Sequence, residues 1–71
     1  MAEINFNPYT ANVLDYVGRP LVAINTGKKV WIQQSMSDGF IIHVDGKVFE
    51  SGLSKLVASS VLNRLQCRLD R

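Results

Sequence analysis

The stretch HVDGKVF, residues 43–49, constrains the fold of this chain more than any other because it predicts a tight turn between two strands. An Asp-Gly pair suits the two central positions of a type I′ turn, where both residues need positive φ angles. Such a turn pairs Val44 with Lys47, His43 with Val48 and Ile42 with Phe49. It therefore fixes the register of one hairpin, and with it the residues that share each face of a sheet.

Residues 21–50 predict a four-stranded antiparallel meander, since short runs of β-branched and aromatic residues are separated by NTG, SDG and DG. A three-residue loop over 37–39, with Gly39 in the left-handed conformation, keeps the apolar residues of the two middle strands on one face. That face comprises Val30, Ile32, Met36, Phe40, Ile42 and Val44. A loop of the same kind at 25–27 adds Val22 and Ile24, and a longer loop there is the alternative.

Helical signals flank the predicted sheet. Asn7 can cap a helix over 8–17, Pro8 suits its first position, and Gly18 ends it. A closing helix is predicted over 52–70, with Ser51 as its cap. The expected fold is a single α+β domain over residues 1–71: a helix, a four-stranded antiparallel β-meander and a C-terminal helix packed on the sheet.

The apolar residues of 52–70 form two stripes at helical spacing. We expect the first stripe, with Leu53, Leu56, Val57 and Val61, to pack on the sheet. The second stripe comprises Ala58, Leu62, Leu65 and Leu69. Arg64, Arg68 and Arg71 continue the first stripe, where burial is costly, so the second half of the helix is expected to project beyond the sheet. Leu62, Leu65 and Leu69 would then be free to form a dimer seam.

The chain has 71 residues, 46% of them hydrophobic and 20% charged, which is typical of one small globular domain. A core of this size is only just sufficient for stability, and oligomerisation is a common remedy. The net charge of +2 comes from eight basic and six acidic residues, so charge alone does not indicate nucleic acid. No apolar run is long enough to span a bilayer, and the first residues lack the pattern of a signal peptide.

Cys67 is the single cysteine, and it cannot form a disulfide within the chain. A lone thiol fits a reducing compartment, so we expect a cytoplasmic protein without membrane partners. Nothing in the sequence brings Cys67, His43 and Asp45 together as a nucleophilic set, and one histidine without a cysteine cluster gives no credible zinc site. We therefore expect no enzyme, no cofactor and no metal.

Trp31 alternates with Val30 and Ile32, so the meander places it on the opposite face of the sheet. The register puts Leu21, Ala23, Ile41, His43 and Val48 beside it. An exposed apolar patch of this kind indicates a protein contact, and tryptophan and arginine are enriched at binding hot spots. The candidate partner-binding residues are Trp31, Ile41, His43, Val48, Arg64 and Arg68. The alternative is that the helix over 8–17 covers this face and buries Trp31.

These features favour a small non-enzymatic interaction protein that binds and regulates or inhibits a macromolecular partner, with a homodimer through Leu62, Leu65 and Leu69. The alternative is a nucleic-acid-binding module. It would use Trp31 as a stacking platform on the open sheet face, together with Lys29 and the C-terminal arginines.

Overall fold

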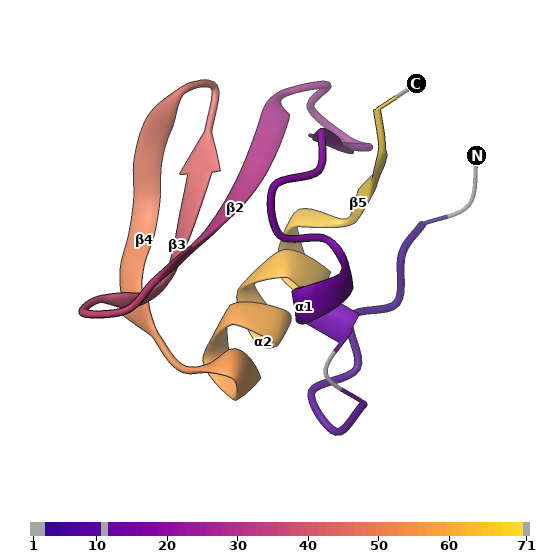
Figure 1. The fold of residues 1–71 in the computed structure, drawn as a ribbon. Coiled ribbons are helices and arrows are strands. Elements are labelled where there is room, and N and C mark those ends of the chain that lie inside the picture. The colour runs from indigo at the N-terminus through magenta and orange to yellow at the C-terminus, as the bar shows by residue number, and fades with distance from the viewer. Residues whose placement is uncertain (1–2, 11, 71) are drawn as a thin grey trace.

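A five-stranded antiparallel sheet forms the framework of the protein (Figure 1). The computed structural model describes residues 3–10 and 12–70. The strands are β1 (Leu21–Ala23), β2 (Lys29–Ser35), β3 (Gly39–Val44), β4 (Lys47–Leu53) and β5 (Cys67–Leu69), in the spatial order β4-β3-β2-β1-β5. Two helices, α1 (Asn12–Asp15) and α2 (Lys55–Leu65), complete the α+β fold. The predicted four-stranded meander is present, and the fifth strand was not expected.

The turn at Asp45-Gly46 has the predicted geometry. The φ angles of these residues are 55° and 80°, and Val44 pairs with Lys47 and His43 with Val48. Beyond that point the register shifts, because Ile42 pairs with Glu50 instead of Phe49. The extra residue makes a β-bulge in β4, and Phe49 is about half exposed.

The β2–β3 hairpin keeps the predicted faces. Gly39 is left-handed, with φ 67°, and it pairs with Ser35 across a loop over 36–38. The register differs by two positions from the predicted one, and an even shift leaves every side chain on its face. The predicted core residues Val30, Ile32, Phe40 and Ile42 are buried, whereas Met36 lies in the loop and is fully exposed.

The first hairpin contradicts the prediction for β1. Leu21 pairs with Val30, so its loop is one residue longer than the three-residue loop of the prediction. A one-residue slip exchanges the two faces of a strand. Leu21 and Ala23, which were expected beside Trp31, are therefore part of the core, and Ile24 is exposed.

The N-terminal helix is shorter than the predicted span of 8–17. Residues 8–10 form a turn in which Asn7 Oδ1 accepts a hydrogen bond from Tyr9 N over 2.8 Å, as a capping residue would. The helix α1 begins at Asn12, and residue 11 lies outside the described residues. Val13 is buried, and Tyr16 and Val17 pack against the core.

The predicted C-terminal helix over 52–70 is wrong at both ends. Ser54, and not Ser51, is the N-cap of α2, with its side chain accepting a hydrogen bond from Val57 N over 3.2 Å. Gln66 ends the helix in the left-handed conformation, with φ 54°. The chain then forms β5, which pairs with β1 at the edge of the sheet.

The expected leucine seam for a homodimer does not exist as an exposed surface. Leu62 is fully buried, and Leu65 and Leu69 pack against the core within the same chain. The expected environments of the two stripes are only partly observed. Val61 of the first stripe is buried as predicted, but Leu56 and Val57 of that stripe are about half exposed. Ala58 and Leu62 of the second stripe are buried. Leu62 is therefore not accessible for the predicted dimer seam, and Leu65 and Leu69 are partly buried.

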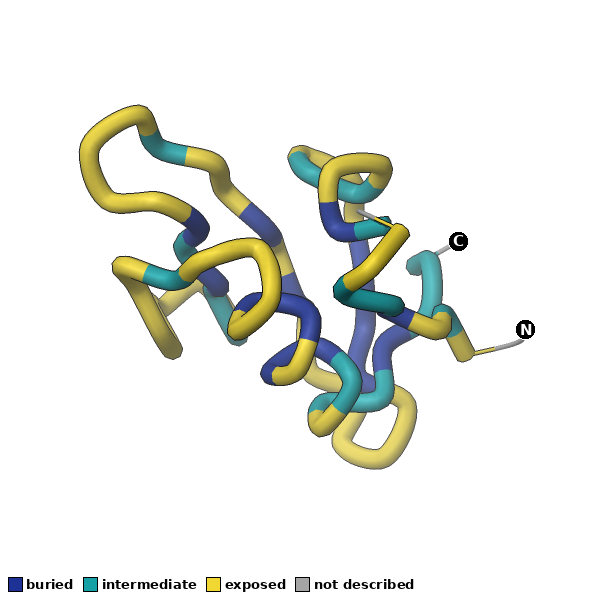
Figure 2. Tube along the Cα trace, turned by 90° about the horizontal axis from the view of Figure 1, so that it is seen from below, coloured by how far each residue is buried: buried dark blue, intermediate teal, exposed yellow. Residues whose placement is uncertain are grey.

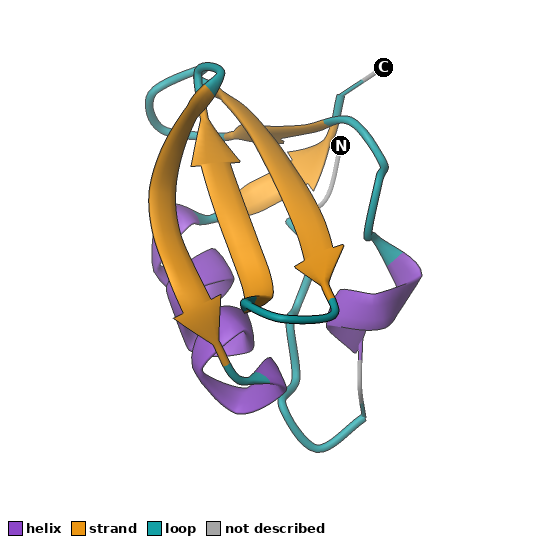
Figure 3. Ribbon diagram, turned by 60° about the vertical axis from the view of Figure 1, so that its left-hand side comes forward, coloured by secondary structure: helices purple, strands orange, loops and turns teal. Residues whose placement is uncertain are grey.

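The helices lie on one side of the sheet. Helix α2 contacts β3 and β4, and α1 contacts α2. In Figure 3 the strands β2, β3 and β4 face the viewer with α2 behind them, and α1 lies beyond the edge of the sheet. Figure 2 shows the buried segments where strands and helices meet, with the turns exposed. Within the described residues, no helix has both the length and the apolar character required to cross a membrane.

Candidate functional site: the outer face of the sheet

The face of β2, β3 and β4 that points away from the helices carries Trp31, Ile41, His43 and Val48, which we call the outer face. The strand register brings these residues together: Trp31 pairs with His43, and His43 pairs with Val48. Ile41 pairs with Gln33, two positions along β2 from Trp31. Four of the six predicted partner-binding residues are therefore neighbours on one surface.

The outer face is accessible to a partner. The side chain of Trp31 is 44% exposed and that of Val48 is 60% exposed, whereas Ile41 and His43 are partly buried. The alternative in which the first helix covers Trp31 is wrong, because α1 packs on the core side through Val13. The chain that leaves α1 does approach the indole, since a Cβ atom on Gly18 would lie 4.0 Å from Trp31 Cζ2.

His43 is held in place by its neighbour across the strands. Its Nε2 atom lies 2.9 Å from Gln33 Oε1, and both side chains project from adjacent strands on the outer face. The ring therefore has a hydrogen-bonding partner within the protein. This is the environment of a positioned surface histidine, and no second histidine exists in the sequence to form a metal pair with it.

A groove of about 410 Å³ lies beside Trp31. Its exposed apolar lining comes from Pro20 and Trp31, and Gly46 of the tight turn also lines it. Leu21 and Val30 contribute to the lining as well, with side chains that are almost fully buried in the core. Lys29, His43 and Asp70 supply the polar groups of the lining. The register of β1 with β2, together with the tight turn after β3, brings these segments to one place.

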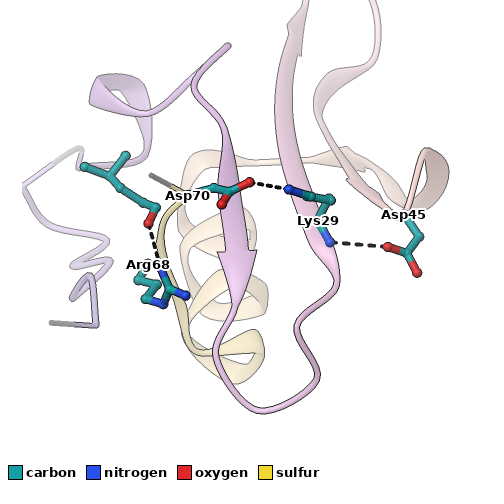
Figure 4. Close-up of polar contacts among 5 residues, drawn as sticks. Lys29, Asp45, Arg68 and Asp70 are labelled. Carbon is teal, nitrogen blue, oxygen red and sulfur yellow. Dashed lines mark hydrogen bonds and ion pairs between the residues drawn. The ribbon is translucent and has the colours of Figure 1, made fainter. Parts of the chain in front are cut away.

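The polar groups around the groove are paired with one another (Figure 4). Lys29 Nζ and Asp70 Oδ2 form an ion pair at 2.5 Å, and the backbone N–H of Lys29 donates to Asp45 Oδ1 over 3.3 Å. Arg68 Nη1 donates to the carbonyl oxygen of Leu69 over 3.1 Å. The basic groups near Trp31 are thus partly engaged by acidic or carbonyl groups of the same chain.

Arg64 and Arg68 do not lie on the helical stripe that was predicted for Arg64, Arg68 and Arg71, and Arg71 lies outside the described residues. Arg64 is exposed near the end of α2, whereas Arg68 is on β5 and pairs with Val22 across the strands. The predicted stripe fails because Gln66 ends the helix between them. Arg68 lies on the same side of the sheet as Lys29, since Val22 pairs with both residues.

Cys67 and His43 lie on opposite faces of the sheet. Cys67 is fully buried in the core, where burial first and the charge of Glu3 second raise the pKa of its thiol to about 11. A thiol with that pKa is protonated at neutral pH and is a weak nucleophile. Across residues 3–10 and 12–70, no three His, Cys, Asp or Glu side chains gather into a group that could hold a metal ion.

Sequence reasoning missed the groove because it depends on residues from separate segments. Pro20 and Asp70 contribute to it from the same end of the β1–β5 pair, before β1 begins and after β5 ends, where Asp70 N donates to Pro20 O over 3.0 Å. The available signal was the alternation of Cys67, Arg68 and Leu69, which has the period of a strand.

Comparisons of the chain with protein-family models, with curated proteins and with solved structures gave no match.

Proposed function

We propose that this protein acts without catalysis, by binding a protein partner through its outer face and thereby regulating or inhibiting that partner. The observation that carries the proposal is the position of Trp31. Its indole is 44% exposed on a sheet face that none of the described helices covers, beside an apolar groove. Exposed apolar surface with a tryptophan at its centre is typical of protein contacts.

A protein partner is favoured over nucleic acid by the aromatic content and charges of this face. Proteins that stack bases on a sheet usually present more than one aromatic ring, and here Ile41 and Val48 occupy the neighbouring positions. The ammonium group of Lys29 is paired with Asp70. The arginine stripe that supported nucleic-acid binding is interrupted at Gln66.

The proposal of a non-enzymatic role is supported by the chemistry of the candidate nucleophile. The Cys67 thiol is buried with a raised pKa, on the face of the sheet opposite His43. A buried lone thiol is also compatible with a cytoplasmic location, which we propose on that basis.

Comparative affinity capture from the native host lysate tests the proposed function. Wild type, Trp31→Ala and Val48→Asp are immobilised in equal amounts. Tyr9→Ala is the control, because Tyr9 is an aromatic residue that is 89% exposed in the turn before α1 and does not belong to the sheet. Quantitative mass spectrometry should identify a protein that binds wild type and Tyr9→Ala but is lost with both outer-face variants. Truncation of a hot-spot tryptophan is expected to weaken the affinity by about 30-fold or more. Equal capture of every protein by all four baits would contradict the proposal.

Titration with labelled oligonucleotides at low salt tests the alternative directly. A nucleic-acid module would bind with an affinity that falls steeply as salt rises, and Lys29→Ala or Arg68→Ala would weaken it. We expect no such binding by wild type. Salt-dependent binding that is lost with these variants would replace the protein partner with a nucleic acid.

A further inference from the structure

The groove beside Trp31 indicates which kind of side chain the partner inserts. We propose that its occupant is one uncharged, large apolar side chain, aromatic or branched aliphatic, presented by the partner protein. This inference rests on the proposed function and adds the kind of residue that the partner inserts.

The lining and size of the groove suit a single apolar side chain. Pro20 supplies exposed aliphatic surface, and the indole of Trp31 forms an aromatic wall that is still partly exposed. Leu21 and Val30 also line the groove, but their side chains are almost fully buried in the core. A volume of about 410 Å³ lies at the low end of the range of about 300–1,000 Å³ that holds small-molecule ligands. A groove of this size suits one large side chain with the backbone that carries it.

Charge complementarity selects an uncharged occupant. Each of the three polar side chains in the lining already has a partner within the chain: Lys29 and Asp70 bind each other at 2.5 Å, and His43 lies 2.9 Å from Gln33. The two formal charges of the lining are opposite in sign and cancel. A cationic side chain would compete with Lys29 for Asp70, and an anionic side chain would compete with Asp70 for Lys29. Either would therefore gain less than it would from an unpaired charge.

An apolar side chain neither competes with the Lys29–Asp70 ion pair nor loses the hydration of a charge. It removes the exposed surfaces of Trp31 and Pro20 from water, which is favourable in proportion to the apolar area that is buried. It leaves the Lys29–Asp70 pair at the rim, where polar groups surround the apolar centre of an interface. Arg68 and Asp45 lie outside this centre, with hydrogen bonds of their own.

Four blocked amino acids serve as probes for this preference: the N-acetyl amides of phenylalanine, leucine, arginine and aspartate. Each is titrated into ¹⁵N-labelled protein while the backbone amides and the indole N–H of Trp31 are followed by NMR. The phenylalanine and leucine probes should shift the Trp31 indole and the amides of Lys29 and Gly46, with dissociation constants of about 1 mM. The charged probes should bind at least about tenfold more weakly.

Variants with matched controls locate the binding. Trp31→Ala should weaken the phenylalanine probe at least about tenfold, while Tyr9→Ala should leave it unchanged. Val48 does not line the groove, so Val48→Asp should leave binding of the phenylalanine probe unchanged if the fold is retained. Asp70→Asn removes one member of the ion pair and should improve binding of the aspartate probe relative to wild type.

Several results would overturn the inference. These are equal or tighter binding of a charged probe, shifts centred on the exposed Leu56 and Val57 of α2, and the absence of localised shifts at about 10 mM probe. Shifts of the same amides on raising the protein concentration alone would identify a second copy of the chain as the occupant, which also contradicts the proposal. If capture of the partner depends on Trp31 but the charged probes bind more tightly than the apolar ones, the proposed function stands and only this inference fails. If capture does not depend on Trp31, the proposed function fails whatever the probes show.

Discussion

The side-chain amide of Asn63 and the backbone of Phe6 form two hydrogen bonds with each other, although the two residues are 57 positions apart in the sequence. Asn63 Nδ2 donates to Phe6 O over 2.8 Å, and Phe6 N donates to Asn63 Oδ1 over 2.9 Å. The same N-terminal segment donates from Ile4 N to Cys67 O over 2.9 Å, and the ring of Phe6 is fully buried. The segment before α1 is therefore fixed to α2 and β5 and belongs to the core.

Replacement of Asn63 with alanine should lower the free energy of unfolding by about 2 kcal/mol, because both backbone groups of Phe6 lose their partner in a partly buried setting. Asn5→Ala is the control, since it makes the same change at an exposed residue of the N-terminal segment. Urea unfolding measures both. Equal effects of the two substitutions would show that the Asn63 bonds do not stabilise the fold.

Gly39→Ala should be far more destabilising than Gly27→Ala, although both glycines have positive φ angles, of 67° and 71°. A left-handed alanine costs about 1–2 kcal/mol at either position. At Gly39 the new Cβ atom would also lie 2.6 Å from the backbone oxygen of Leu53, whereas at Gly27 nothing lies within 4 Å. Thermal unfolding should show a clear excess loss for Gly39→Ala, and similar losses would contradict the close approach of β3 and β4.

Leu62→Ala should cost about 2–5 kcal/mol because Leu62 is fully buried in the core. Leu56→Ala should cost less than about 1 kcal/mol, since this side chain is 51% exposed on the same helix. Unfolding in denaturant compares the two variants. The opposite ranking would restore the projecting helix and the leucine seam expected from the sequence.

Cys67 should make the protein less stable at alkaline pH. Its pKa is raised from 9.0 to about 11 in the folded protein by burial and by Glu3, so the unfolded chain loses the proton first. The stabilising contribution is complete below about pH 9 and is lost as pH rises toward 11, by up to about 3 kcal/mol. The stability difference between wild type and Cys67→Ala, measured in urea at about pH 8 and about pH 10.5, should shift by about 2 kcal/mol in favour of the variant. A constant difference would contradict the raised pKa.

The turns of the meander were predictable because single residues determine them. Asp45 and Gly46 adopt the positive φ angles expected of a type I′ turn, and Gly39 adopts the left-handed conformation predicted for the preceding loop. These two turns determined which side chains of β2 and β3 share a face. They therefore placed Trp31 on the face of the sheet opposite to that of Val30 and Ile32. The central part of the outer face therefore followed from local turn chemistry and the alternation of side chains.

The fifth strand was not predictable by the same reasoning because its sequence also fits a helix. Leu62, Leu65 and Leu69 recur at helical spacing, and the break comes from Gln66 in a left-handed conformation that usually indicates glycine or asparagine. Tertiary pairing decides the outcome, since β5 gives β1 a second neighbour and places Cys67 beside Ala23. The groove was missed for the same reason, because Asp70 reaches it only through β5.

The register of β1 shows how one loop residue changes an interpretation. A three-residue loop would place Leu21 beside Trp31, whereas the observed pairing of Leu21 with Val30 places it in the core. Sequence alone does not distinguish these loops, because Gly27 accommodates both. The outer face is therefore smaller than expected, and Trp31 is its main exposed aromatic group.

Fluorescence of Trp31 tests the central claim most directly, because the chain has no other tryptophan. Acrylamide quenching of the indole is measured in the free protein and after saturation with the partner obtained by capture. We predict efficient quenching in the free protein, in keeping with an indole that is 44% exposed, and strong protection in the complex. A saturated complex in which the indole is quenched as readily as in the free protein would contradict a binding role for the outer face.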